Sequence, residues 1–178
     1  MKNVLILAGS NSQKSINKQL AEYIGNQIQD VNLIIQNWEE LELPLYSPHY
    51  EEEFGLPEKA TAFKKIINQS DGIVISLAEH NSMPTAAFKN LWDWVSRINK
   101  KVWSDKPIFL AATSPGGRGA QSALNIIKDL MPHYGGNVIV DYSLPKFHDN
   151  FTQNGIKDED KARELKGKID QFQTSIND

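Results

Sequence analysis

The chain has 178 residues, of which 40% are hydrophobic and 23% are charged, and both fractions are near those of ordinary globular domains. A formal net charge of −3 without a basic stripe argues against a nucleic-acid partner. The absence of cysteine excludes a disulfide framework, a thiolate nucleophile and a cysteine-based metal site. A chain of this length can bury roughly 70% of its unfolded surface, so we expect one domain over residues 1–178.

We expect no targeting signal in the N-terminal segment. Its apolar run, Val4–Ala8, is too short for the core of a signal peptide. No apolar stretch approaches the roughly 20 residues of a membrane helix. We therefore expect a cytoplasmic protein without membrane insertion.

Short apolar or β-branched runs alternate with longer segments of helical periodicity. The runs are Val4–Leu7, Val31–Ile35, Gly72–Leu77, Pro107–Ala112 and Asn137–Val140. The apolar residues of the helical segments are Leu20, Ile24 and Ile28; Ala62, Phe63, Ile66 and Ile67; Phe88, Leu91, Trp92 and Val95; Ala120, Ala123, Leu124, Ile127, Leu130 and Met131; and Leu165, Ile169, Phe172 and Ile176, the last within a helix at about 158–176. This alternation predicts an α/β fold with a parallel sheet that helices cover on both faces.

Two segments are predicted as long loops, Leu43–Leu56 and Leu144–Ile156. Each either wraps a ligand or a neighbouring subunit, or is an ordinary surface excursion. The helical segment around Leu124 is apolar over a wide arc, because Ala123 and Ile126 point away from Leu124. The excess faces either a partner subunit or one of the long loops.

The residues after the first apolar run suggest a phosphate site. In an open parallel sheet, ligands bind beyond the carboxyl ends of the strands. Residues 9–17 supply hydroxyl and backbone N–H groups at the start of a helix, where an anion is favoured. Neither a Walker loop nor a dinucleotide fingerprint is present, so a monophosphate fits better than a pyrophosphate. The alternative is that Ser15 merely caps the helix.

Two more polar loops follow the third and fourth runs, at residues 77–84 and 113–119. The adjacent Gly116 and Gly117 either let the backbone approach a flat ligand or form only a tight turn with positive φ. His80 is more typical of a loop residue than of a base. No Ser-His-Asp order or metal-ligand spacing occurs, so we predict no catalytic residue and no metal.

In these three loops the sequence resembles the NADPH-dependent FMN reductase family, which includes many bacterial quinone and azo-dye reductases. The resemblance spans roughly residues 3–140. The matching positions are Gly9, Ser10, Ser15 and Asn17 in the first loop; Glu79, Asn81, Lys89, Asn90, Asp93 and Trp94 in the second loop and its helix; and Gly116 and Gly117 in the third. Ser12 replaces the arginine of the family's phosphate loop, so either Lys14 supplies the missing charge or FMN binds less tightly. His80 replaces the tyrosine that sits beside the flavin.

The resemblance implies a flavodoxin-like three-layer α/β/α sandwich with a five-stranded parallel sheet of order 2-1-3-4-5. It implies an FMN-dependent oxidoreductase that takes hydride from NADPH or NADH and passes it to a quinone, free flavin, azo compound or similar small-molecule acceptor. The cofactor carries the chemistry, so no acid or base is required of the protein. The implied cofactor-binding residues are Ser10, Ser12, Ser15, Ile16, Asn17, Glu79, His80, Asn81, Ser82, Met83, Ser114, Pro115, Gly116 and Gly117.

Two alternative functions share this fold. One is a flavodoxin-type electron carrier without pyridine-nucleotide activity, although such carriers are usually far more acidic than −3. The other is a flavin-free binding domain, because fold alone does not determine function.

The sequence also raises the question of assembly. Trp94 lies about 200° around the helix from Trp92, which predicts an exposed tryptophan beside the wide apolar helix. Members of the family commonly pair through these two helices, so the resemblance implies a homodimer or homotetramer. The alternative is that Trp94 lies under the Lys100–Trp103 turn within one subunit.

Overall fold

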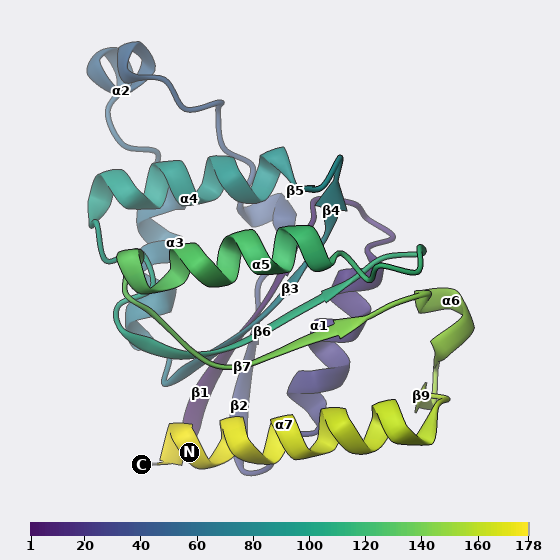
Figure 1. Ribbon diagram of the computed structural model, residues 1–178. Helices are drawn as coiled ribbons and strands as arrows, with labels where there is room; N and C mark the ends of the chain where they lie inside the picture. The colour runs from purple at the N-terminus through teal and green to yellow at the C-terminus, as the bar shows by residue number, and fades with distance from the viewer. Residues whose placement is uncertain (178) are drawn as a thin grey trace.

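A computed structural model, which describes residues 1–177, contains a five-stranded parallel sheet with helices on both faces (Figure 1). The strands are β1 (Lys2–Gly9), β2 (Val31–Ile35), β3 (Gly72–Leu77), β6 (Lys106–Thr113) and β7 (Gly136–Leu144). Their spatial order is β2-β1-β3-β6-β7, which is 2-1-3-4-5 when these five are counted along the chain. The predicted fold class and strand order are confirmed.

The helices form the two outer layers. One layer contains α1 (Ile16–Asn26) and α7 (Glu159–Asn177), and the other contains α3 (Glu58–Gln69), α4 (Ala86–Ile98) and α5 (Gln121–Leu130). The shorter elements are η1 (Trp38–Glu40), α2 (Pro48–Phe54), β4 (Glu79–His80), β5 (Met83–Pro84), η2 (Met131–Tyr134), α6 (Phe147–Asn150), β8 (Phe151–Thr152) and β9 (Gly155–Ile156). Across residues 1–177, no helix combines the length and the apolar character needed to span a lipid bilayer.

Alternation along the strands divides the apolar interior into two cores. In β1, Leu5 and Leu7 pack against the layer of α3, α4 and α5, whereas Val4 and Ile6 pack against α1 and α7. All six residues of β3 are buried, as expected for a central strand covered on both faces. The near-continuous apolar runs of the sequence thus reflect burial on both faces.

Both segments predicted as long loops contain helices, so that prediction was incomplete. Residues 43–56 include α2, which begins after Ser47, whose side chain accepts a hydrogen bond from the Tyr50 amide. Residues 144–156 include α6 and the small β8–β9 hairpin. A helix of two turns has no repeating apolar stripe, which is why the periodicity of the sequence did not reveal α2 or α6.

The prediction that Trp94 is exposed was wrong, since its exposed fraction is 0%. Tyr46 and Tyr50 cover it in edge-on contacts, with ring centroids 5.0 and 5.8 Å from that of Trp94. Its Nε1 donates to the Pro44 carbonyl oxygen at 2.7 Å. The segment around α2, rather than the Lys100–Trp103 turn, therefore buries Trp94.

A buried lysine joins α3 to the turn that follows α4. The Lys64 side chain is almost fully buried, and its Nζ donates to the carbonyl oxygens of Lys101 and Val102 at 2.6 and 2.8 Å and to Ser104 Oγ at 2.7 Å. Burial lowers the pKa of Lys64. All three acceptors lie in one turn, so Lys64 fixes the path of the chain into β6.

We expect Lys64→Met to lower the free energy of unfolding by about 2 kcal/mol, because the buried Val102 carbonyl group would lose the Lys64 donor and two further hydrogen bonds would be lost. Urea denaturation followed by circular dichroism measures this change. Lys65→Met, at the exposed neighbouring position on the same helix, is the matched control. Equal stability of the two variants would show that the three hydrogen bonds contribute nothing.

Candidate functional site

Three loops meet at the carboxyl edge of the sheet, after β1, β3 and β6 (Figure 1). From β1 the chain crosses to β2 on one side and then returns to place β3 on the other side. The gap between β1 and β3 is therefore the topological switch point, where open α/β sheets bind their ligands. The sequence-predicted residues on all three loops are thus brought to one edge.

The side chain of Asn17 connects the start of α1 to β3 and β6. Its side chain is 2% exposed, and its Oδ1 accepts hydrogen bonds from the Thr113 amide at 3.0 Å and from Ser76 Oγ at 2.7 Å. Its Nδ2 donates to the Thr113 carbonyl oxygen at 3.1 Å. Both ends of the amide are therefore engaged with β3 and β6, and the backbone N–H of Asn17 stays free.

The N-terminus of α1 has the donors that a phosphate requires. Ser15 is the N-cap residue, and its Oγ accepts from the Lys18 amide at 3.1 Å. Within residues 1–177, the amides of Ile16 and Asn17 donate to no protein acceptor. Free first-turn amides and the positive end of the helix dipole favour an anion here. The phosphate of FMN fits this position.

The second loop is a tight hairpin formed by β4 and β5. Asn81 and Ser82 form its turn with φ of 52° and 65°, and His80 pairs with Met83. All four side chains are exposed. At the base of the hairpin, Thr85 Oγ1 donates to the Gly9 carbonyl oxygen at 2.9 Å and accepts from the Phe88 amide at 3.1 Å. Thr85 therefore caps α4 and ties the hairpin to the end of β1.

The third loop presents an open backbone. Gly116 and Gly117 do not have positive φ, so the tight-turn interpretation of this pair was wrong; the left-handed residues are Gly119 and Ala120. A Cβ atom added at Gly116 or Gly117 would meet no atom closer than 3.8 Å. The space in front of the pair is therefore free for a ligand to approach the main chain.

Glu79 connects the second and third loops. Its Oε2 accepts from the Ala123 amide at 3.0 Å, in the first turn of α5. The N-cap residue of α5 is Ala120, which has no side chain able to cap. The Glu79 carboxylate therefore supplies both the missing cap and a charge that suits the helix dipole. This role was not visible in the sequence, because the two residues are 44 positions apart.

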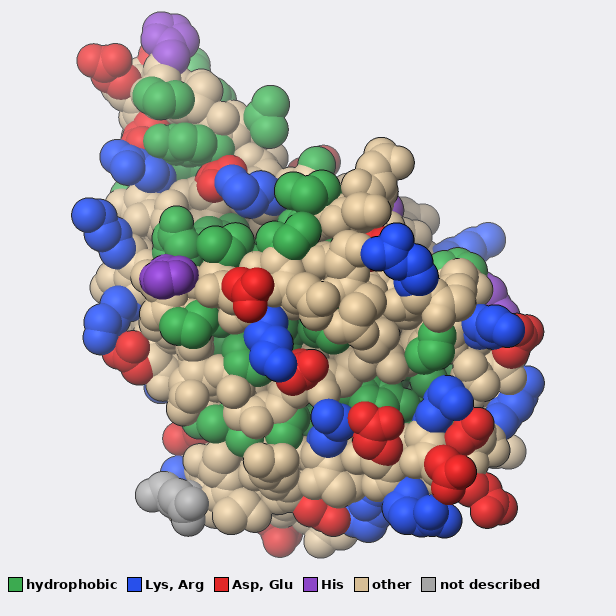
Figure 2. All heavy atoms as spheres, in the orientation of Figure 1, with side chains coloured by type: hydrophobic (Ala, Val, Ile, Leu, Met, Phe, Trp, Pro, Cys, Tyr) green, Lys and Arg blue, Asp and Glu red, His purple; other side chains and the backbone are tan. Residues whose placement is uncertain are grey.

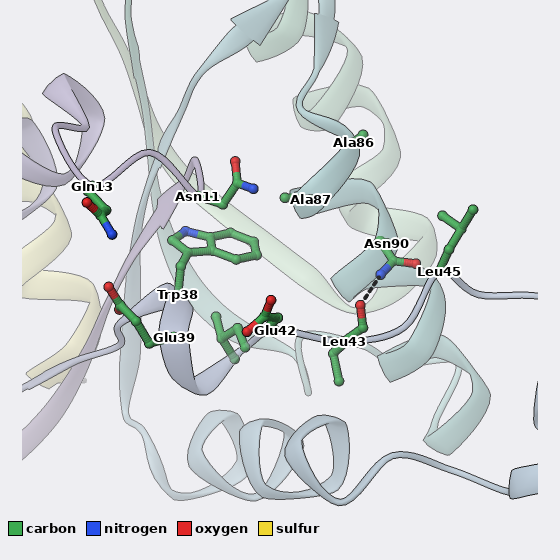
Figure 3. A pocket seen from close by; sticks show the side chains of 11 residues that line it. Asn11, Gln13, Trp38, Glu39, Glu42, Leu43, Leu45, Ala86, Ala87 and Asn90 are labelled. Carbon is green, nitrogen blue, oxygen red and sulfur yellow. Dashed lines mark hydrogen bonds between the residues drawn. The ribbon is translucent and has the colours of Figure 1, made fainter.

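A cavity of about 430 Å³ opens on the other side of the first loop (Figure 3). It lies around the indole of Trp38, among residues that follow the carboxyl ends of β1 and β2 and residues of the first turns of α4. The residues that line it are Asn11, Gln13, Trp38, Glu39, Leu41, Glu42, Leu43, Leu45, Ala86, Ala87 and Asn90. None of the residues predicted to hold the cofactor lines this cavity. The rule that ligands bind beyond the carboxyl ends of parallel strands identified the other loops. It applies equally to the residues after β2 and could have found Trp38 and Glu39.

This topology, with free amides at a helix N-terminus beside the switch point, defines a protein of the flavodoxin-like fold. Residues 2–149 match the family model described as NADPH-dependent FMN reductase, and the chain belongs to this family. The resemblance inferred from the three loops is confirmed. Membership of this family implies FMN as the cofactor and NAD(P)H as the reductant.

Characterised relatives and a solved structure agree with this assignment. The chain is 35% identical over 121 residues to the 2-hydroxy-1,4-benzoquinone reductase of a Burkholderia species, and the match covers 67% of this chain but only 64% of that enzyme. It is 25% identical to the NADH:(hydroxy)cinnamate reductase subunit CrdA of Vibrio ruber, over 92% of this chain and 81% of that one. The flavoenzyme FerB of Paracoccus denitrificans superimposes with a TM-score of 0.79 and 26% identity, over 99% and 98% of the two chains.

We expect Asn17→Ala to lower the free energy of unfolding by roughly 3 kcal/mol, because the Thr113 peptide and the Ser76 hydroxyl would lose buried partners. Thermal or urea unfolding measures the loss. Asn11→Ala, an exposed position on the preceding loop, should change stability by less than about 0.5 kcal/mol. An Asn17→Ala protein as stable as the Asn11→Ala control would refute the clamp.

Proposed function

We propose that this protein is an FMN-dependent oxidoreductase that takes hydride from NADH or NADPH and passes it to a quinone or a similar small-molecule acceptor. The free amides of Ile16 and Asn17 at the switch point carry this proposal. The names of the relatives support it, because they are called reductases of a benzoquinone and of hydroxycinnamate. When bound, FMN supplies the hydride-transfer and electron-transfer chemistry.

In this proposal the first loop holds the phosphate. The hydroxyls of Ser10, Ser12 and Ser15 would donate to the phosphate together with the amides of Ile16 and Asn17. Ser10 and Ser15 are each 7% exposed, so their hydroxyls are held in place before a ligand arrives. Ser12 Oγ already accepts from the Lys14 amide at 3.3 Å, which shapes the exposed part of the loop. Lys14 is the cation available there in place of the family arginine.

The flat ring would rest between the second and third loops. The hairpin residues His80, Asn81, Ser82 and Met83 present exposed side chains on one side, and residues 114–117 present open main chain on the other. The N–H groups of Gly116 and Gly117 suit the polar edge of the ring. Glu79, whose carboxylate is committed to α5, positions the hairpin and does not touch the cofactor in this proposal.

We expect the protein to bind FMN in preference to FAD, because the first loop has donors for one phosphate and no second mononucleotide half is present. Chromatography of the extracted cofactor identifies it, and NADH or NADPH oxidation with a benzoquinone measures activity.

Ser15→Ala should weaken FMN binding roughly tenfold or more, since a hydrogen bond to a charged phosphate is lost. Ser175→Ala, on α7, is the control. Recovery of FAD, or no flavin uptake, would contradict the proposal.

We further propose that two copies of this chain pair. The segment around α2 exposes Leu45, Phe54 and Leu56 at 81%, 63% and 43%, and Leu130 at the end of α5 is 40% exposed. Figure 2 shows hydrophobic side chains gathered on this projecting segment and on the surface beneath it. Apolar side chains grouped in this way are typical of an interface. The segment around α2 of the neighbouring copy would also cover the flavin ring, which the loops of a single chain leave open.

We expect light scattering to give about twice the chain mass of 20.1 kDa, or a multiple of that dimer. A protein with both Leu45→Glu and Phe54→Glu should be monomeric, because the charges would be buried in the interface. Ile35→Glu, at an exposed apolar position on the edge strand β2, should leave the mass unchanged. A monomeric wild-type protein with FMN bound would overturn the dimer.

A further inference from the structure

The cavity around Trp38, here named the Trp38 cavity, is not used by the proposed flavin site. Its volume of about 430 Å³ falls within the range of small-molecule sites. We propose that it binds the adenosine half of the pyridine nucleotide and selects NADH over NADPH. This inference rests on the proposed function, because it concerns the hydride donor of that reaction.

The indole of Trp38 is fixed as a stacking surface. Its Nε1 donates to the Ala8 carbonyl oxygen at 2.7 Å, which ties η1 to the end of β1. Trp38 is half-buried, and in Figure 3 its ring lies in the middle of the cavity, with Asn11 and Ala87 above it. An aromatic ring held in this way binds a base by stacking without needing to be ordered first.

Two carboxylates stand beside this surface. Glu39 and Glu42 both line the cavity and are exposed, and neither forms an ion pair within the part of the chain that the structure describes. A carboxylate accepts hydrogen bonds from the hydroxyls of a ribose. It repels a phosphate attached to the same sugar.

The lining contains nothing that would bind a 2′-phosphate. No lysine, arginine or histidine is among the lining residues. In α/β domains with the glycine-rich dinucleotide fingerprint, which this chain lacks, an acidic side chain bonds to the ribose of NAD and an arginine accommodates the 2′-phosphate of NADP. The same chemistry applies to a ribose placed beside Glu39 and Glu42. Glu39 lies in η1, which is the first element after β2. The charge of the Trp38 cavity therefore favours the unphosphorylated nucleoside.

The position of the cavity agrees with this assignment. Asn11 and Gln13 line it and also belong to the first loop, which would hold the FMN phosphate. A nucleotide with adenosine in the cavity and nicotinamide at the ring would carry its pyrophosphate along this loop. Lys14 is the exposed cation of that loop and forms no ion pair with any described residue.

Adenosine and adenosine 2′-monophosphate test the site without a 5′-phosphate that could enter the flavin site. Calorimetric titration of the purified protein, with FMN in excess, should show adenosine binding at least about fivefold tighter, the factor expected for one like-charge contact in water. The double variant Glu39→Gln with Glu42→Gln should remove this difference and lower the KM for NADPH relative to that for NADH. Trp38→Ala should weaken adenosine at least about fivefold, the lower end of the range for a lost stacking contact.

The control removes two charges from α7, on the opposite face of the sheet, through Glu159→Gln with Glu164→Gln. It should keep both the adenosine preference and the KM ratio of the wild type. Absence of adenosine binding would overturn the inference, whether the cavity does not recognise the nucleoside or a side chain of a partner subunit fills it. Equal effects of the two double variants would also overturn it. Because adenosine binding is measured without turnover, a protein that binds adenosine as described but oxidises neither nucleotide supports the cavity and refutes the proposed function.

Discussion

The buried side chain of Asn17 is the contact on which the rest of the candidate site depends. It lies in the first turn of α1, yet it bonds to Ser76 and Thr113, which follow it by 59 and 96 residues. Both ends of the amide are used in a dry environment, so α1 cannot shift along the sheet without leaving buried polar groups unpaired. The clamp thereby aims the N-terminus of α1, with its free amides, at the switch point.

Several positions that match the family motif have side chains that bond to the protein's own main chain at this edge. Asn17 joins three elements, and Glu79 caps α5. Asn90 Nδ2 and Trp94 Nε1 both donate to the Pro44 carbonyl oxygen, at 3.0 and 2.7 Å, and so hold the segment that leads to α2. Each of these side chains makes a long-range bond to main chain. These motif positions therefore help to specify where the loops lie.

Sequence periodicity was sufficient to predict the strands and the helices that cover them, but not the segments that connect them. The five strands and α7 were predicted within a few residues, because a buried strand or a long amphipathic helix repeats its pattern many times. The two-turn helix α2 has no such repeat, and its fold back onto α4 made the prediction for Trp94 wrong. The Gly116–Gly117 pair lies in the loop after β6, as predicted, but the conformation of that loop depends on bonds from the Lys146 amide to Gly116 and from the Phe147 amide to Ser114, which no local pattern encodes.

Charge differs on the two sides of the first loop, and this difference follows from what each side would have to hold. Beside the third loop lie Arg118 and Lys146, which form no ion pair with the described residues, and the Lys146 stem lies 3.9 Å from where a Cβ of Gly117 would stand. Such cations suit the polar edge of a flavin. Across the loop, Glu39 and Glu42 line the Trp38 cavity, none of whose lining residues is cationic; Lys59 Nζ donates to the main-chain oxygen of Glu39 at 2.9 Å and forms no ion pair with its carboxylate. The two sides of the first loop therefore suit different groups: the cations at the third loop suit an anionic ligand edge, whereas the carboxylates of the Trp38 cavity disfavour an added phosphate.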